Sequence, residues 1–226
     1  MSRIRLSSLD PREVPDRLLD LMAGSDSICP HLHICAQAGD DAILKAMRRN
    51  YDTAYYRDLL ARVRQRLPDA AIGSDIIVGF PGENDGQFEA SLAYFANLPL
   101  TYFHVFPYSS RRGTVAATLP DAVAAPVKKL RAQRMRELGA RKKQEFCAGF
   151  AGQRVAVLVE GRVDKATGLG RGFSRNYLPV ALAGAGVPPN REVTVRLGEY
   201  RSGWLRGIVD IVATPADQRN LTATGG

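Results

Sequence analysis

The stretch Gly73-Ser-Asp-Ile-Ile-Val-Gly-Phe-Pro-Gly-Glu83 constrains this chain most, because a short apolar run ends there in a turn that leads into a helix. The unbroken β-branched run Ile76–Val78 predicts a parallel strand that is covered on both faces. The Gly-Phe-Pro-Gly turn ends this strand, and Glu83 or Asn84 is expected to cap the amphipathic helix that follows.

Ligands of parallel βα units bind beyond the carboxyl ends of the strands, where glycines let the backbone approach closely. We therefore expect ligand contacts first at Asp75, Gly79 and Glu83. The alternative is an ordinary strand-to-helix turn that binds nothing.

The same alternation of strands and helices extends over residues 1–122. Strands are predicted at Ile4–Leu9, His31–Cys35, Ala71–Val78 and Leu100–Phe106, and further helices at Val14–Met22, Ala42–Arg49 and Ala54–Leu67. Right-handed crossovers would place the turns on one rim of a partial α/β parallel barrel. Four strands cannot close a barrel, so we expect a piece of a longer protein, or self-association through the open half-barrel.

The second half of the chain has a different pattern. Residues 123–150 predict one long basic helix that connects two domains, with Leu130 and Leu138 among its few large apolar anchors. Residues 151–213 contain short alternating runs that predict a small all-β, OB-like barrel, at Arg154–Val159, Tyr177–Leu182, Val193–Leu197 and Trp204–Val209. Residues 214–226 are expected to be a polar tail.

The positive charge is concentrated in this second half. The net charge is +8, and the helix at 123–150 alone carries eight lysines and arginines against two glutamates. Such a surplus predicts a polyanionic partner, and basic residues interleaved with aromatic ones are typical of proteins that stack unpaired bases. The alternative is that Phe173, Tyr177 and Trp204 fill the barrel core, which we expect of at least one of them.

The chain carries no sign of export or membrane insertion. It has no run of eighteen apolar residues and no apolar signal segment after Met1. Its three cysteines form neither a CxxC pair nor a disulfide framework, which is typical of a reducing compartment. We therefore expect a cytoplasmic protein with no membrane partner.

Several segments together resemble the radical SAM methylthiotransferases. The order and spacing hold for residues 3–10, 31–39, 47–51, 75–83 and 104–114, which read RIRLSSLD, HLHICAQAG, MRRNY, DIIVGFPGE and HVFPYSSRRGT. The segment Arg171-Gly-Phe-Ser-Arg-Asn-Tyr177 resembles the TRAM domain that closes those proteins and binds tRNA. The segment His-Val-Phe-Pro-Tyr-Ser, residues 104–109, is most similar to the corresponding segment of the branch that acts on threonylcarbamoyladenosine beside the anticodon.

The resemblance implies the second half of a radical SAM TIM-like barrel followed by a TRAM barrel, with tRNA as partner. It also implies S-adenosyl-L-methionine (SAM) and iron-sulfur clusters as cofactors of the full-length enzyme. A CxxxCxxC loop is absent, so the cluster ligands lie outside this chain, which we expect to be inactive alone. We expect no catalytic residue and no metal ligand here. The alternatives are a stand-alone, non-catalytic RNA-binding protein and, less favoured by the strand ends, an aldolase-type lyase.

The resemblance also suggests the site residues. The residues expected to bind SAM are Ser7, Ser8, Gln37, Arg49, Asp75, Gly79, Phe106 and Tyr108. The residues expected to bind RNA are Lys128, Arg131, Arg162, Arg171, Phe173, Arg175, Asn176, Tyr177 and Arg201. The alternative for Ser8 and Glu83 is a solvated turn, and for Arg49 a surface cation.

Overall fold

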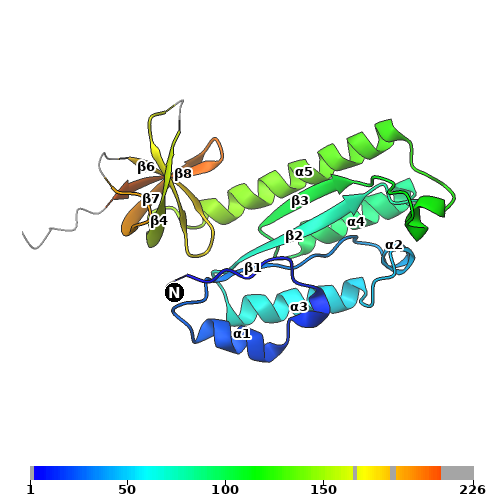
Figure 1. Cartoon of the computed structure of the whole chain (residues 1–226), viewed down its shortest axis with the longest axis horizontal. Helices are drawn as coiled ribbons and strands as arrows, with labels where there is room; N and C mark the ends of the chain where they lie inside the picture. Colours follow the sequence, from blue (N-terminus) through cyan, green and yellow to red (C-terminus); the bar gives the residue numbers. More distant parts are fainter. Residues whose placement is uncertain (1–2, 165–166, 184–186, 210–226) are drawn as a thin grey trace, which may run out of the picture. The chain divides into compact units, whose positions relative to one another are not determined.

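The computed structural model describes residues 3–164, 167–183 and 187–209, which form two compact units (Figure 1). One unit contains Met1–Gly149 together with Arg175–Tyr177, and the other contains Phe150–Ser174 and the chain from Leu178 onward. The expected polar tail, residues 214–226, lies outside the described residues. In the described ranges, no helix has the length and apolar character needed to cross a membrane.

The sheet of the first unit has three parallel strands in the order β1 (His31–His33), β2 (Ala71–Val78) and β3 (Tyr102–Pro107). The predicted parallel arrangement is therefore confirmed for these strands. In the register, Gly73 pairs with His33 on one side and with Tyr102 on the other, and Asp75 pairs with His104.

The strand predicted at Ile4–Leu9 is wrong. This segment runs beside the chain around β1 but forms only two isolated parallel bridges, Ile4 to Ile28 and Leu9 to Ile34. Ser8 adopts a φ of 58°, a left-handed conformation that interrupts an extended strand. The segment is still held in place, because the Leu9 N–H donates to the His33 carbonyl at 2.8 Å.

The predicted helices are confirmed to within about three residues at each end. The helical elements are η1 (Pro11–Glu13), α1 (Asp16–Ala23), α2 (Asp41–Ala46), α3 (Thr53–Arg66), α4 (Asp85–Asn97), η2 (Val115–Thr118) and α5 (Ala125–Ala148). Asp40 caps α2 by accepting from the Ile43 N–H at 3.0 Å. Asn84, rather than Glu83, caps α4, in a reciprocal capping box with Gln87.

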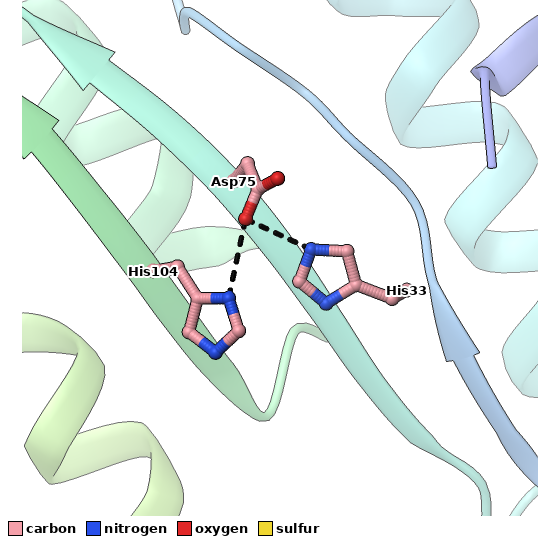
Figure 2. A group of neighbouring side chains, drawn as sticks. All are labelled: His33, Asp75 and His104. Carbon is pink, nitrogen blue, oxygen red and sulfur yellow. Dashed lines mark hydrogen bonds and ion pairs between the residues drawn. The ribbon is translucent and has the colours of Figure 1, made fainter. Parts of the chain in front are cut away.

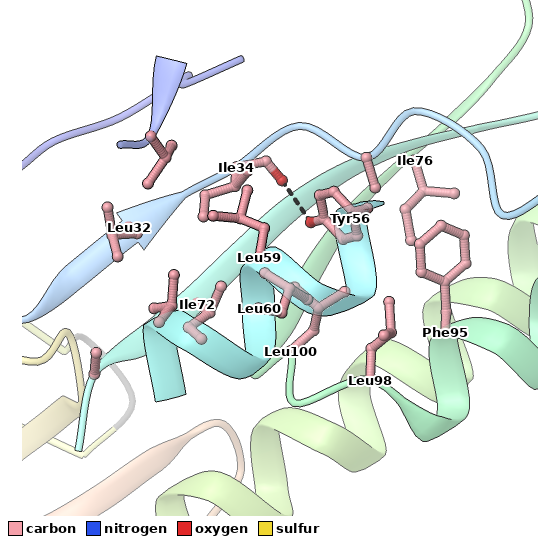
Figure 3. Packing of buried hydrophobic residues seen from close by; sticks show 14 of the residues in the cluster. Leu32, Ile34, Tyr56, Leu59, Leu60, Ile72, Ile76, Phe95, Leu98 and Leu100 are labelled. Carbon is pink, nitrogen blue, oxygen red and sulfur yellow. Dashed lines mark hydrogen bonds between the residues drawn. The ribbon is translucent and has the colours of Figure 1, made fainter. Parts of the chain in front are cut away.

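One face of the sheet packs into the main hydrophobic core (Figure 3). Alternate side chains of β1, of the residue that follows it and of β2 meet apolar residues of α3, of α4 and of the loop before β3. Leu32, Ile34, Ile72 and Ile76 face Tyr56, Leu59, Leu60, Phe95, Leu98 and Leu100. The Tyr56 hydroxyl, buried in this core, donates to the Ile34 carbonyl at 2.8 Å. Because strand side chains alternate, the intervening residues point to the opposite face.

Helix α5 is part of this first unit as well as a connection. It packs on β3, and its buried residues include Ala132, Met135 and Leu138. Gly139 lies against Phe103, since a Cβ there would come within 3.0 Å of the ring. Leu138 is an anchor as expected, whereas Leu130 is 57% exposed, so that part of the prediction is wrong.

The second unit is a closed barrel with the strand order β4-β5-β6-β8-β7. Its strands are β4 (Arg154–Val163), β5 (Gly170–Ser174), β6 (Pro179–Ala183), β7 (Glu192–Arg201) and β8 (Trp204–Val209). The small all-β barrel is confirmed, although β5 was not among the predicted runs. The barrel core is aliphatic: Val157, Val159, Leu178, Val180, Leu182, Val195, Leu197 and Leu205. None of Phe173, Tyr177 and Trp204 is buried, so the expectation that one fills the core is wrong.

Candidate functional site

The face of the sheet opposite the main core carries all three histidines of the chain, and we call it the polar face: His31, His33, Asp75, Tyr102 and His104. Two of the histidines converge on one carboxylate (Figure 2). Asp75 Oδ1 lies 2.9 Å from His33 Nε2 and 3.2 Å from His104 Nδ1. The two imidazole rings stack with centroids 5.0 Å apart.

Tyr102 extends this group toward the start of β1. Its hydroxyl lies 2.8 Å from His31 Nε2 and 3.3 Å from His33 Nδ1. The tyrosine ring lies across β2 at Gly73, where an added Cβ would come within 2.1 Å of a ring atom. Glycine is therefore required at this position by close packing, and it is what lets Tyr102 reach both histidines.

Burial sets the protonation states on the polar face. It lowers the pKa of His31 to about 4, with the charges of Arg5 and His33 acting in the same direction. Burial also lowers the pKa of His33, although the Asp75 carboxylate opposes this. Burial, followed by the charge of Asp75, raises the pKa of the Cys35 thiol to about 11. Near neutral pH, His31 and His33 are therefore neutral, and Cys35 keeps its proton.

The turn after β2 is closed by its own side chains. Gly79 has a φ of 72°, and its N–H donates to both carboxylate oxygens of Glu83 at 3.1 Å. Arg131 of α5 donates to Glu83 Oε1 at 2.8 Å and to the Glu83 carbonyl at 2.9 Å. Burial raises the pKa of Glu83, while the Gly79 N–H and Arg131 act against that shift. Glu83 is thus neither a free ligand contact nor a solvated turn residue, which corrects both expectations.

Two of the residues expected to bind RNA, Arg131 and Lys128, form hydrogen bonds from α5 to the chain just beyond β2 and β3. Arg131 is 5% exposed and also donates to Asp85 Oδ1 at 2.6 Å, so its guanidinium is not available to a nucleic acid. The prediction for Arg131 is therefore corrected. Lys128 Nζ donates to the Tyr108 carbonyl at 3.1 Å, and its stem lies against Gly79.

Four of the eight residues expected to bind SAM lie at or just beyond the carboxyl ends of the strands: Gln37, Gly79, Phe106 and Tyr108. Gln37 has a φ of 65° and continues the ladder beside β2, where its N–H donates to the Asp75 carbonyl at 2.9 Å. Phe106, at the end of β3, is 50% exposed. Ser7, Ser8 and Arg49 are exposed, and Asp75 lies in mid-strand.

Tyr108 provides an observation that fits a bound polar ligand. It follows β3 and packs edge-on against Phe80, with ring centroids 5.2 Å apart. Its hydroxyl is buried and has no hydrogen-bond partner within the described part of the chain. A buried polar group without a partner costs free energy, and a ligand group at the strand ends would remove that cost.

The cysteines do not fit an iron-sulfur cluster. Cys29 and Cys147 are buried, and Cys35 points at Asp75 with its sulfur 3.6 Å from Oδ2. Among the described residues, the only group of three or more potential metal ligands is His33, Asp75 and His104. A cluster needs several thiolates around it, so this chain does not supply such a set.

The barrel presents its aromatic residues next to arginine. Arg171 lies over the Trp204 ring, with its guanidinium carbon 4.6 Å from the centroid, and forms an ion pair with Asp164. Phe173 contacts Trp204 with ring centroids 5.9 Å apart. A cavity of about 890 Å³ beside Trp204 is lined by Arg171 and, on β7, by Arg201 among other residues.

The other residues expected to bind RNA are divided between the two units. Arg162 is exposed on β4, and Arg201 is exposed and paired with Glu199 at 2.7 Å. Arg175, Asn176 and Tyr177 group with the first unit, and Asn176 is buried.

The sequence interpretation missed His33, Tyr102 and His104 as site residues. A signal was present, because polar residues alternate in His31-Leu-His33 and in Tyr102-Phe-His104 on two predicted strands. Polar residues at every second position of a strand occupy one face. Their convergence on Asp75 depends on the strand register, which this pattern does not give.

Comparisons with known proteins give relatives for both halves of the chain. The family model of the Radical SAM superfamily matches residues 2–95. Threonylcarbamoyladenosine tRNA methylthiotransferase MtaB of Rickettsia prowazekii is 38% identical over 182 residues, which are 80% of this chain and 41% of that protein. A tRNA-2-methylthio-N(6)-dimethylallyladenosine synthase of Bacillus licheniformis is 34% identical over 209 residues, 91% of this chain and 40% of that protein.

A solved structure supports the fold of part of this chain. Coproporphyrinogen III oxidase (HemN) from Escherichia coli, described as a radical SAM enzyme, aligns with a TM-score of 0.52 at 21% identity, over 62% of this chain and 32% of that one. The chain spans about two fifths of the length of the curated relatives it matches. The resemblance expected from the motifs is confirmed: this chain is related to the radical SAM tRNA methylthiotransferases and is similar to part of their length.

Proposed function

We propose that this chain is the C-terminal part of a tRNA methylthiotransferase, which adds a methylthio group to a modified adenosine beside the anticodon. The observation that carries the proposal is the 209-residue similarity to a methylthio-adenosine synthase. The first unit contains 152 residues, 149 from Met1–Gly149 and three from Arg175–Tyr177, so the similarity must extend into the barrel. A radical SAM domain alone would not require that.

In this proposal the first unit contributes part of a SAM pocket. Ser7, Ser8, Gln37, Arg49, Asp75, Gly79, Phe106 and Tyr108 are the proposed contacts. The exposed Phe106 ring and the Tyr108 hydroxyl, which has no hydrogen-bond partner among the described residues, support this assignment at the end of β3. When bound, SAM would supply the radical and the methyl group. The residues of this chain would orient it, and the cluster that cleaves it would need ligands from outside the chain.

The barrel is proposed to be a TRAM-like module that holds the tRNA. This part of the proposal rests on Arg171 and Trp204, whose guanidinium and indole stack on each other. The indole offers a π-face on which an unpaired base can stack, and the guanidinium offers a positive charge to a neighbouring phosphate. Within the barrel, Arg162 and Arg201 would add backbone contacts, and Phe173 is a further aromatic candidate. Arg175 and Tyr177, which group with the first unit, are separate candidates. The proposed substrate is threonylcarbamoyladenosine, after the Rickettsia relative, although the Bacillus relative is named for dimethylallyladenosine.

The test is the binding of an anticodon stem-loop RNA to the purified chain. Trp204 is the only tryptophan, so stacking of a base on it should quench the intrinsic fluorescence. The affinity should fall steeply with salt. Fluorescence anisotropy of labelled RNA, which does not need the tryptophan, should show that Trp204→Ala weakens binding about 5- to 160-fold, since one stacked base is worth about 1–3 kcal/mol. Arg171→Ala should reduce the salt slope by about one.

A matched control exists in the first unit. Arg12 lies over the Tyr55 ring with its guanidinium carbon 4.8 Å from the centroid, which is nearly the same geometry as Arg171 over Trp204. Arg12→Ala therefore removes an equivalent stacked cation and should leave RNA binding unchanged. If Arg12→Ala weakens binding as much as Arg171→Ala does, the barrel is not the RNA-binding surface.

The second candidate is a non-catalytic RNA-binding protein. It is favoured by one observation: the Arg171–Trp204 pair lies wholly in this chain, whereas a set of cluster thiolates does not. Mass spectrometry of tRNA nucleosides separates the two. A longer protein that includes a CxxxCxxC loop should form methylthio-adenosine, and the present chain alone should not. Product formed by the present chain would overturn the proposed inactivity.

A further inference from the structure

We propose that the polar face contains a binding site for one divalent transition-metal ion, ligated by His33 Nε2, Asp75 Oδ1 and His104 Nδ1. The ligand set of two imidazoles and one carboxylate suits Zn²⁺, Fe²⁺ and Co²⁺. This site is separate from any iron-sulfur cluster, because it uses no thiolate. It does not depend on the proposed function.

The positions of the three ligand atoms carry the proposal. In a tetrahedral site with metal-ligand distances near 2.0–2.1 Å, neighbouring ligand atoms are about 3.3 Å apart. The distances from Asp75 Oδ1 are 2.9 Å to His33 Nε2 and 3.2 Å to His104 Nδ1. All three atoms lie within 4.8 Å of one another. Small side-chain rotations would therefore place them around one ion.

The backbone holds these ligands in place. Each comes from a different one of three adjacent, hydrogen-bonded strands, and Asp75 on the central strand is in register with His104. Ligands on strands are positioned more precisely than ligands on loops. His33 is 5% exposed at its side chain, so its ring has little freedom to turn away.

The contacts around His33 support the tautomer that metal binding requires. Binding through Nε2 requires the proton on Nδ1, which must then find an acceptor. The Tyr102 hydroxyl, 3.3 Å from Nδ1, can accept this proton while donating to His31 Nε2 at 2.8 Å. Metal-bound histidines typically donate their second N–H in this way. The ring can therefore bind a metal without losing a hydrogen bond.

Exposure increases across the site from β1 to β3. The side chain of His33 is 5% exposed, that of Asp75 27% and that of His104 57%. An ion would enter from the His104 side, and water would complete its coordination there. Three protein ligands and an open position are typical of zinc sites that bind substrate rather than of closed structural sites.

The experiment uses the purified 226-residue chain, freed of metal with EDTA. Co²⁺ should bind with a stoichiometry of one and give visible d–d bands without a sulfur charge-transfer band, and Zn²⁺ should displace it. His104→Ala and Asp75→Asn should each weaken Zn²⁺ binding by more than about 100-fold, since loss of an outer-layer contact alone costs about 10–100-fold. Isothermal titration calorimetry measures the affinities.

His31→Gln is the matched control. His31 is the remaining histidine, lies on the same face and bonds to Tyr102, but it is not a proposed ligand. We expect Zn²⁺ affinity within about tenfold of the unsubstituted chain. His104 is exposed, so its replacement should preserve the fold, which circular dichroism checks.

Two results would overturn the proposal. One is the absence of stoichiometric binding below about 100 µM Zn²⁺, which would leave His33, Asp75 and His104 as a hydrogen-bonded network only. The other is binding that survives His104→Ala or that shows a cobalt-thiolate band, because the ligands would then be different residues.

Discussion

Removal of the Arg131 guanidinium should destabilise the first unit strongly. Arg131 and Glu83 are 5% and 7% exposed, and the arginine makes two hydrogen bonds to Glu83. Arg131→Met keeps an unbranched, apolar side chain but leaves a buried carboxylate without a cation, held only by the backbone at Gly79 and Phe80. Breaking a buried ion pair by removing one partner costs about 3–5 kcal/mol. With a urea m-value of about 2 kcal/mol/M, the midpoint should fall by about 1.5–2.5 M.

The assay can follow each unit separately. The described helices all lie in the first unit, so ellipticity at 222 nm follows its unfolding. Trp204 is the only tryptophan and lies in the barrel, so its fluorescence follows the second unit. Arg131→Met should shift the first transition. An equal shift in both signals would mean that α5 stabilises the two units together.

Two further variants test the cause. Arg134→Met removes an exposed arginine from the same helix, where it pairs with the exposed Glu89, and should leave the midpoint nearly unchanged. Glu83→Gln combined with Arg131→Met should recover much of the loss, because no unpaired charge remains. If the double variant is as unstable as Arg131→Met alone, the buried charge is not the reason.

The sign of the pH dependence follows from Glu83. Burial already raises its pKa, and loss of Arg131 would raise it further. In Arg131→Met the folded state therefore binds this proton more tightly than the unfolded state does. The variant should lose stability as the pH rises from about 4.3, the ordinary glutamate pKa, through the folded-state pKa. Urea titrations at pH 5 and pH 8 should show the larger deficit at pH 8.

Three further outcomes are expected. Gly79→Ala should destabilise the first unit more than Gly82→Ala, as measured by urea titration. Both glycines have positive φ, but a Cβ at Gly79 would lie 2.3 Å from Lys128 Cγ, whereas a Cβ at Gly82 would meet nothing within 4 Å. Tyr56→Phe should cost about 1–2 kcal/mol in the same assay, because a buried backbone carbonyl loses its donor. The Cys147 thiol should resist iodoacetamide at pH 8, as measured by mass spectrometry. It is 1% exposed, and burial raises its pKa to about 11, so only about one molecule in a thousand is thiolate.

The sequence predicts well what local patterns determine. Apolar periodicity locates β1, β2 and β3 and the helices, and the Asp40 cap of α2 follows from residue type and position. The strand predicted at Ile4–Leu9 fails because its apolar alternation is compatible with a φ of 58° at Ser8, which periodicity does not report. The pattern of apolar side chains predicts which face of an element is buried, but it does not determine the backbone dihedral angle of each residue.

What the sequence cannot give are contacts between distant segments. Arg131 is one of eight cations in a basic helix, and its difference from Arg134 lies in Glu83, a partner 48 residues away. The His33–Asp75 and Asp75–His104 contacts likewise join residues from separate strands. A shift of one residue in either register would move the ligands to the opposite face.

The two proposals for the first unit make competing demands on Asp75. The resemblance assigns it to SAM, yet its Oδ1 already contacts two histidines and its Oδ2 lies 3.6 Å from Cys35 Sγ. Gly79 comes directly after β2 and is four residues beyond Asp75, which corresponds to about 13 Å at 3.3 Å per residue. A ligand bound at the turn would therefore have to extend back along the strand to reach a carboxylate that is already engaged. The geometry favours a division in which Gly79 and Tyr108 contact SAM and Asp75 belongs to the histidines.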